Sequence, residues 1–398
     1  VTASDGGSIT VNARNLEMTG ESILLAGIDS GLGSNNSQAG NIEVHATVAI
    51  NLNNSSEIAN QVQPKANGQG GNVNISASTL RIEGAAQVNT LTSGAGKAGS
   101  LSVDAQDVQI IGTSADGFPS ALRSSALSNS TGDGGDLTLR TNTLLVRDGA
   151  QVLTSTFATG KGGSLSVDAQ DVQLIGTSAD GQYFSGLFTS AVPNSTGDAG
   201  DLTINTGELL IQDGAEVGAE ARSQGNAGNI TINVDGLLRA TNGDIITTAE
   251  RSSGGAITIT AKDMRLFGDS NIATNVLSGV GGGGNITLNA NSIIALNDSD
   301  ILAFARDGRG GNITLNTPAF FGQNYQPTLS GADRLTLDGN NRVDLNATGD
   351  LSSGIITTPE PSLVQNSFIE LPQNLIDTSS LIASSCIARR NQKQQGSF

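Results

Sequence analysis

The sequence predicts an all-β protein: a right-handed parallel β-helix, or solenoid, of about eleven coils, followed by an irregular C-terminal tail. Three observations lead to this fold class. A short glycine-containing phrase recurs along most of the chain, and each copy continues in strict alternation of aliphatic and polar residues. The composition, with 52 Gly, no Trp and 3% aromatic residues, suits a thin core built layer by layer from small aliphatic side chains.

The recurring phrase consists of Gly or Ala, then Gly, then one polar or small residue, then an aliphatic–polar–aliphatic triplet. Its second glycines are 33, 31, 28, 36, 28, 37, 28, 27, 29 and 27 residues apart, so the unit has about 28 residues with insertions in some copies. A period of this length is typical of a solenoid. The copies begin at Gly6, Ala39, Gly70, Ala98, Gly134, Gly162, Ala199, Ala227, Gly254, Gly283 and Gly310.

The triplet of each phrase predicts a strand with one buried face. Both outer positions are aliphatic and the residue between them is polar in every copy, a period of two that strands produce. We expect the aliphatic side chains to point inward. The pairs are Ile9/Val11, Ile42/Val44, Val73/Ile75, Leu101/Val103, Leu137/Leu139, Leu165/Val167, Leu202/Ile204, Ile230/Ile232, Ile257/Ile259, Ile286/Leu288 and Ile313/Leu315.

Each unit holds two further short strands, exemplified by Leu80–Ile82 and Asp300–Leu302. Three strands joined by tight turns account for about 28 residues, which is one coil. A leucine-rich repeat would need a helical side, and a propeller blade would need about 40 residues or more. Stacked coils pair each strand with its equivalent about 4.8 Å away. The glycines are expected at corners, where they supply either positive φ or close backbone approach.

We divide the chain into a β-helix at 1–358 and a tail at 359–398. Two insertions, near 112–130 and 176–195, interrupt the repeat. The segment from Gly99 to Val108 recurs almost unchanged from Gly163 to Val172, an offset of 64 residues or two coils. The insertions should therefore be loops on the same side of the helix, two coils apart.

The composition excludes several functional classes. Lys plus Arg total 20 against 37 Asp plus Glu, a net charge of −17, so nucleic acid is not an expected partner. No apolar run approaches the ~20 residues of a membrane-spanning helix, so membrane insertion is not expected. Cys386 is the only cysteine, which excludes an intrachain disulfide. Val1 leads directly into repeat sequence, and we expect a segment of a longer protein.

Several segments carry a resemblance to a known family. They are the units Gly284–Asn289 and Gly311–Asn316, the steps Asp148–Val152 and Asp213–Val217, the stretch Ser353–Pro359 and the ending from Ile369 to Cys386. These segments resemble the large filamentous-haemagglutinin-like exoproteins of cyanobacteria, in particular their C-terminal part. The resemblance implies a protein that is secreted or displayed on the outer cell surface. It also implies export by two-partner secretion through a dedicated outer-membrane β-barrel partner, and an adhesive role.

The sequence predicts no catalytic, cofactor-binding or metal-binding residues. No EF-hand loop and no Gly-Gly-x-Gly-x-Asp nonapeptide occurs, so a specific calcium site is not predicted, and weak calcium binding stays open. His45 is the only histidine and has no second histidine or paired cysteine, so neither a metal site nor a Ser-His-Asp triad is expected. Acidic residues at expected corners are assigned to solvated turns, as at Asp133/Asp136, Asp198/Asp201 and Asp298/Asp300.

The aromatic residues of the insertions form a candidate partner-contact surface: Tyr183, Phe184 and Phe188, with Phe118 two coils away. Exposed apolar side chains often mark binding surfaces. In the alternative interpretation, the insertions pack back onto the helix.

We therefore expect a structural or adhesive protein without enzymatic activity or a cofactor, whose partners are cell-surface or extracellular polysaccharides or proteins. Two alternatives stay open. One is a polysaccharide-active enzyme on a β-helix scaffold, which three or more converging carboxylates with a basic residue on one face would favour. The other is a passive stalk.

Overall fold

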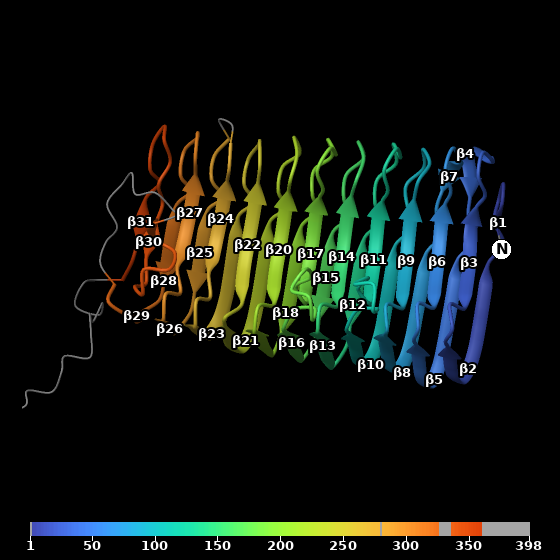
Figure 1. Cartoon of the computed structure of the whole chain (residues 1–398), viewed down its shortest axis with the longest axis horizontal. Helices are drawn as coiled ribbons and strands as arrows, with labels where there is room; N and C mark the ends of the chain where they lie inside the picture. Colours follow the sequence, from blue (N-terminus) through green and yellow to red (C-terminus); the bar gives the residue numbers. More distant parts are fainter. Residues whose placement is uncertain (1, 279–280, 326–335, 360–398) are drawn as a thin grey trace, which may run out of the picture. The chain divides into compact units, whose positions relative to one another are not determined.

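The computed structural model describes residues 2–278, 281–325 and 336–359, and they form a parallel β-helix (Figure 1). The predicted all-β solenoid is confirmed, and no α-helix occurs in these residues. The triplet of each of the eleven phrases begins a strand, and successive strands of this kind are one coil apart. The described residues therefore make about ten full turns. The predicted tail, including Cys386, lies outside the described residues except for Pro359.

One face of every coil belongs to sheet A, a 12-stranded sheet whose paired strands are parallel. Its strands, in order along the stack, are β1 (Thr2–Ala3), β3 (Ile23–Ile28), β6 (Glu57–Val62), β9 (Gln87–Thr92), β11 (Ala121–Ala126), β14 (Gln151–Thr156), β17 (Gly186–Ala191), β20 (Glu216–Ala221), β22 (Asp244–Ala249), β24 (Ile272–Val276), β27 (Ile301–Ala305) and β30 (Leu345–Asn346).

Sheet B contains the strand that begins at each triplet and the strand that follows it in the same coil. In some coils one long strand contains both, and in others the two are separate. Its strands are β2 (Ile9–Met18), β5 (Ile42–Leu52), β8 (Val73–Glu83), β10 (Leu101–Ile111), β12 (Leu137–Arg140), β13 (Thr143–Arg147), β15 (Leu165–Asp168), β16 (Asp171–Ile175), β18 (Leu202–Thr206), β19 (Glu208–Gln212), β21 (Ile230–Thr241), β23 (Ile257–Phe267), β25 (Ile286–Asn289), β26 (Ser292–Ala295), β28 (Ile313–Asn316), β29 (Phe320–Gly322) and β31 (Ile356–Thr357). A small separate sheet pairs β4 (Gly33–Gln38) with β7 (Asn67–Gln69).

The aliphatic pairs of the phrase line the core, as predicted. Ile42 pairs with Val73, and Val73 pairs with Leu101, so equivalent residues stack in register. Every pair from the second copy to the eleventh is buried, whereas Ile9 and Val11 of the first copy are half-buried. Full burial of one such side chain contributes roughly 1.5–3 kcal/mol, and a coil obtains it only between two neighbours.

Close backbone approach explains the second glycine of the phrase. A Cβ atom at Gly71 would lie 2.1 Å from the carbonyl oxygen of Gly40, and one at Gly163 would lie 1.8 Å from that of Gly135. A side chain here would push two coils apart. Positive φ angles occur instead at the corner that precedes sheet A, as at Asp213 with a φ of 58°. At Gly149, in the corner before β14, both roles coincide: its φ is 85° and a Cβ atom there would lie 2.8 Å from the backbone nitrogen of Ser178.

In most coils the side chain of the residue after the second glycine is hydrogen-bonded to the next coil. The side-chain oxygen of Asn72 accepts the backbone N–H of Ser100 at 2.9 Å, and Asp136 accepts that of Ser164 at 3.0 Å. Asp201 accepts the N–H of the equivalent residue in the next coil at 2.8 Å. Corner carboxylates such as Asp136 and Asp201 thus satisfy backbone donors, which solvated turns alone would not require.

Sheet A also turns hydroxyl groups into the interior. Thr247 and Thr274 are fully buried, and each donates a hydrogen bond to a phrase glycine, Gly255 at 2.8 Å and Gly284 at 2.7 Å. The threonines therefore hold sheet A against the glycine corner of the same coil. A buried hydroxyl is tolerated because it has this partner.

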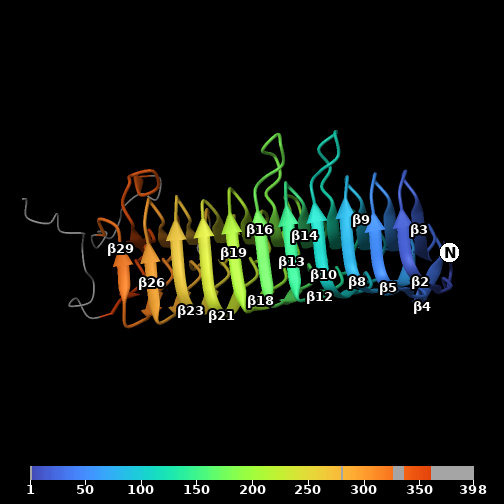
Figure 2. The same ribbon diagram turned by 90° about the horizontal axis from the view of Figure 1, so that it is seen from below.

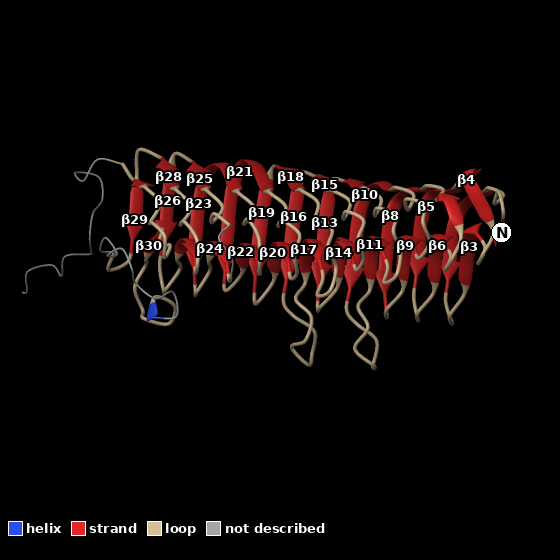
Figure 3. Ribbon diagram, turned by 90° about the horizontal axis from the view of Figure 1, so that it is seen from above, coloured by secondary structure: helices blue, strands red, loops and turns tan. Residues whose placement is uncertain are grey.

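The two insertions project on the same side of the stack, two coils apart, as predicted (Figures 2 and 3). The loops span residues 112–120 and 176–185 and have the same local structure. An antiparallel bridge closes each one, Thr113 with Pro119 and Thr177 with Phe184.

The predicted insertion ranges, 112–130 and 176–195, extend too far. Their second parts contain β11 and β17, which pair regularly with the neighbouring strands of sheet A. These strands place Ser124 and Thr189 at buried positions. Because these inward positions are polar, the alternation that identifies the other strands is missing here.

Candidate functional site

The candidate site is a groove on the outward face of sheet A, beside the second insertion loop. A cavity of about 340 Å³ lies there. Its floor comes from β14, β17 and β20, which are neighbours in the stack, and its wall from the loop 176–185. The lining includes Tyr183, Phe184, Phe188, Glu216, Glu220 and Arg222.

Phe188 forms part of the floor. It points outward from β17, between the buried Leu187 and Thr189, and pairs in register with Gly218 of β20. A Cβ atom at Gly218 would lie 3.0 Å from Phe188 Cδ1, and one at Gly186 would lie 2.9 Å from Cζ. The two glycines therefore make room for the ring against the sheet.

The second insertion loop carries Tyr183 and Phe184. The N–H of Ser178 donates to the carbonyl of Tyr183 at 2.7 Å, and the N–H of Tyr183 donates to Ser178 Oγ at 2.9 Å. Gln151 Nε2 of β14 donates to the carbonyl oxygen of Phe184 at 3.3 Å, which attaches the loop to sheet A. The Phe184 side chain stays exposed, at 45%. Fixed backbone thus presents aromatic groups to solvent.

Phe118 does not line this groove. It lies in the first insertion loop and is 63% exposed. The loop tips come close to each other, since a Cβ atom at Gly117 would lie 3.5 Å from Asp180 Oδ2. The structure therefore gathers three of the four predicted contact residues in one groove, while the fourth stands outside it. Phe188 belongs to a strand and not to a loop.

The groove contains a half-buried carboxyl group, Glu216, and an ion pair. Burial raises the pKa of Glu216 to about 8, and the charges of Glu220 and Asp244 add to this rise, while Arg222 opposes it. Arg222 Nε lies 2.6 Å from Glu220 Oε2. At neutral pH Glu216 is therefore mostly protonated and can donate a hydrogen bond to a ligand.

Sequence reasoning missed Glu216, Glu220 and Arg222. The alternation along Glu216–Ala221 was sufficient to place both glutamates on the outward face. Their position beside Phe188 depends on the pairing of β17 with β20, and β17 begins directly after the second insertion loop. That register could be obtained only once the end of the insertion was known.

A second surface depression follows sheet B, where successive coils contribute His45, Ser76, Asp104 and Arg140. His45 is exposed, and its Nδ1 lies 2.7 Å from Ser76 Oγ. In a catalytic triad the histidine lies between the serine and the acid. Here the serine occupies the middle position, so Asp104 is not placed to orient the imidazole.

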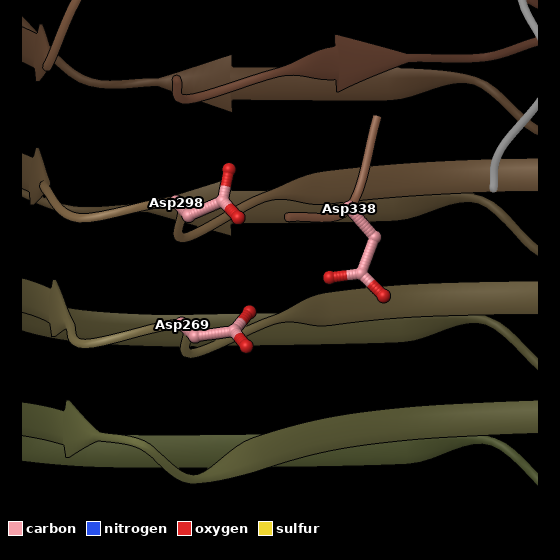
Figure 4. A group of neighbouring side chains, drawn as sticks. All are labelled: Asp269, Asp298 and Asp338. Carbon is pink, nitrogen blue, oxygen red and sulfur yellow. The ribbon is translucent and has the colours of Figure 1, made fainter. Parts of the chain in front are cut away.

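Three carboxylates meet over the last coils of the described part (Figure 4). Asp269, Asp298 and Asp338 each bring one carboxylate oxygen within 4.8 Å of the others, and they could hold a metal ion. Asp298 is 8% exposed and Asp300 is 0% exposed. The prediction that Asp298 and Asp300 form a solvated turn is therefore wrong. The cause is the segment 336–344, which packs over this corner through Leu337.

The part of the chain that the structure describes contains no helix of the length and apolarity that a membrane crossing needs. Comparison with protein-family models, curated proteins and solved structures finds no match for this chain. The resemblance to filamentous-haemagglutinin-like exoproteins stays a prediction.

Proposed function

We propose that this chain is the β-helical part of a secreted or cell-surface adhesive protein, and that it binds polysaccharide in the groove of Tyr183, Phe184 and Phe188. The observation that carries the proposal is the groove itself. Three aromatic side chains line this one groove, and two glycines leave room for the ring of Phe188, on an otherwise aromatic-poor chain. Aromatic rings with a few polar groups beside them are typical of binding sites.

The chemistry of the lining supports a sugar ligand. The rings offer apolar faces against which the C–H face of a pyranose can pack, and Glu216, Glu220 and Arg222 offer hydrogen bonds to hydroxyl groups. The net charge of −17 disfavours polyanionic chains. We therefore favour a neutral or amino-substituted polysaccharide. Secretion through an outer-membrane partner, and the adhesive role, rest on the sequence resemblance.

Binding assays on purified protein test the proposal. The wild type and a Tyr183→Ala/Phe188→Ala variant are titrated by affinity electrophoresis against neutral, amino-substituted and acidic polysaccharides. Phe321→Ala is the matched control, because Phe321 is 40% exposed but lies on β29, away from the groove. We expect the double variant to lose binding and the control to retain it.

Two results would contradict the proposal. The absence of binding across the panel would favour the passive stalk, and equal binding by the double variant would place the contact elsewhere. A deletion of residues 182–188 is unsuitable as a control because it removes the start of β17. Point variants avoid this damage to the fold.

A polysaccharide hydrolase is the second candidate, and one observation favours it. Glu216, with its pKa raised to about 8, shares one face with Glu220, Asp244 and Arg222. A protonated carboxyl beside an ionised one is the combination that glycoside hydrolysis uses. Incubation with the same panel, followed by measurement of new reducing ends, tests this candidate. Release of sugars by the wild type but not by Glu216→Gln would establish it, and no release would exclude it for those substrates.

A further inference from the structure

We propose that Asp269, Asp298 and Asp338 bind a calcium ion, and that this ion fastens the segment 336–344 onto the coils beneath it. Asp269 and Asp298 occupy equivalent corners of two neighbouring coils, and Asp338 comes from the covering segment (Figure 4). The three side chains thus bring together two neighbouring coils and the covering segment, whose residues 336–344 belong to no strand.

The geometry suits calcium. The three oxygens lie within 4.8 Å of one another, and two ligands on one calcium ion are up to about 5 Å apart, since each Ca–O bond is about 2.3–2.6 Å. Asp269 and Asp298 have φ angles of 65° and 63°, and their carboxylates point toward the side where Asp338 lies (Figure 4). Carboxylates with water in the remaining positions form the irregular oxygen shell that calcium accepts.

A buried carboxylate beside the cluster provides an independent indication. Asp300 is fully buried; its Oδ1 accepts the N–H of Asp344 at 2.7 Å, and its Oδ2 has no hydrogen-bond partner. Asp300 follows Asp298 by two residues and lies beneath the same covering segment 336–344. A buried carboxylate oxygen without a partner is costly unless it is protonated or a cation lies nearby.

No cationic side chain neutralises the three carboxylates within the described residues. Arg342 donates its backbone N–H to Asp298 at 3.2 Å, while its guanidinium pairs with Asp344. Three ionised carboxylates whose oxygens lie within 4.8 Å of one another repel each other. A divalent cation would remove this repulsion.

The covering segment explains why such a link matters. Leu337, next to Asp338, is 3% exposed and packs against Ala273 and Leu302 on the outward face of sheet A. The end of the segment is held by hydrogen bonds from Arg342 and Asp344, and a calcium ion on Asp338 would fasten its beginning in addition to the Leu337 contact. Because Asp269 and Asp338 are exposed, we expect modest affinity, with a Kd on the order of 10⁻⁴–10⁻³ M, as in extracellular modules.

Thermal unfolding and terbium luminescence test the inference on the chain as it stands. Protein freed of metal with EDTA is unfolded in EDTA, in magnesium and in about 5 mM calcium, several times the expected Kd. We expect Tm to rise by about 2 °C or more in calcium and less in magnesium. The Asp298→Asn/Asp338→Asn variant should lose the rise, and terbium should bind it at least about tenfold more weakly.

Asp213→Asn is the matched control, because Asp213 lies at the same corner with a φ of 58° and asparagine tolerates this conformation. It should respond like the wild type. Asp300→Asn should weaken terbium binding several-fold. The inference fails if calcium does not stabilise the wild type, if magnesium is as effective, or if the double variant or Asp300→Asn binds as tightly as the wild type.

Discussion

Phe188 of β17 and Gly218 of β20 occupy paired positions on the outward face of sheet A, and the absence of a side chain at Gly218 makes room for the Phe188 ring. A Cβ atom at Gly218 would lie 3.0 Å from the ring and 2.7 Å from Glu216 Oε1. One glycine therefore leaves room for both the Phe188 ring and the Glu216 carboxyl group of the candidate site.

Gly218→Ala should weaken polysaccharide binding while leaving the helix folded. The added methyl group must displace the Phe188 ring and the end of Glu216, at a stability cost of about 1 kcal/mol. We expect binding to fall by about tenfold, a change of ~1.4 kcal/mol. Calorimetric titration and the urea midpoint measure the two effects separately. A variant that binds normally would show that the ring position is irrelevant.

Gly163→Ala should destabilise the β-helix severely. Its Cβ atom would lie 1.8 Å from the carbonyl oxygen of Gly135, and a backbone contact cannot relax without separating two coils. We expect a loss of about 3 kcal/mol or more in the free energy of unfolding. Gly282→Ala is the control, because a Cβ there meets nothing within 4 Å and should change stability by less than about 0.5 kcal/mol. Similar urea midpoints for the two variants would argue against the stacking register.

Thr247→Val should cost about 1–3 kcal/mol although it preserves side-chain volume. The buried Thr247 hydroxyl donates to the carbonyl oxygen of Gly255 at 2.8 Å, and valine would leave that oxygen without this donor. Denaturant unfolding measures the change. Thr248→Val, at the next and outward-facing position of β22, is the comparison and should be nearly neutral.

The contribution of Glu216 to the free energy of unfolding should fall as pH rises from about 4.5 to about 8. Its folded-state pKa of about 8 lies above the ordinary value of 4.5, so the native state holds a proton that the unfolded state releases over this range.

Glu216→Gln isolates this contribution. The wild type minus variant difference in unfolding free energy should decrease between about pH 5 and about pH 8.5. Urea midpoints at the two pH values measure it. A difference that stays constant, or that grows with pH, would contradict a protonated Glu216.

The sequence was sufficient to predict the solenoid because each phrase carries its own local signal. Ile257, Thr258 and Ile259 alternate clearly, and a repeated period implies stacking in register. The ends of the insertions were missed because β17 has Thr189 at an inward position. Local alternation is uninformative where the interior is polar.

The candidate sites depend on contacts between coils, which no local pattern contains. Tyr183, Phe184 and Phe188 were predicted because they are close in sequence, whereas Glu216 joins them only through strand pairing. Asp338 reaches Asp298 because a segment folds back over sheet A. A segment that folds back over the sheet is not part of the repeat, so the periodic pattern of the sequence does not predict it.

The most direct test of the central claim is calorimetric titration of the wild type and of Phe188→Ala with an oligosaccharide from the best-binding polysaccharide. Phe321→Ala, exposed on β29, is titrated in parallel as the control. We predict that Phe188→Ala raises Kd by about tenfold or more, because loss of an aromatic contact of this kind costs over ~1.4 kcal/mol, and that Phe321→Ala leaves Kd unchanged. Equal Kd values for the wild type and Phe188→Ala would contradict the claim that the groove is the binding site.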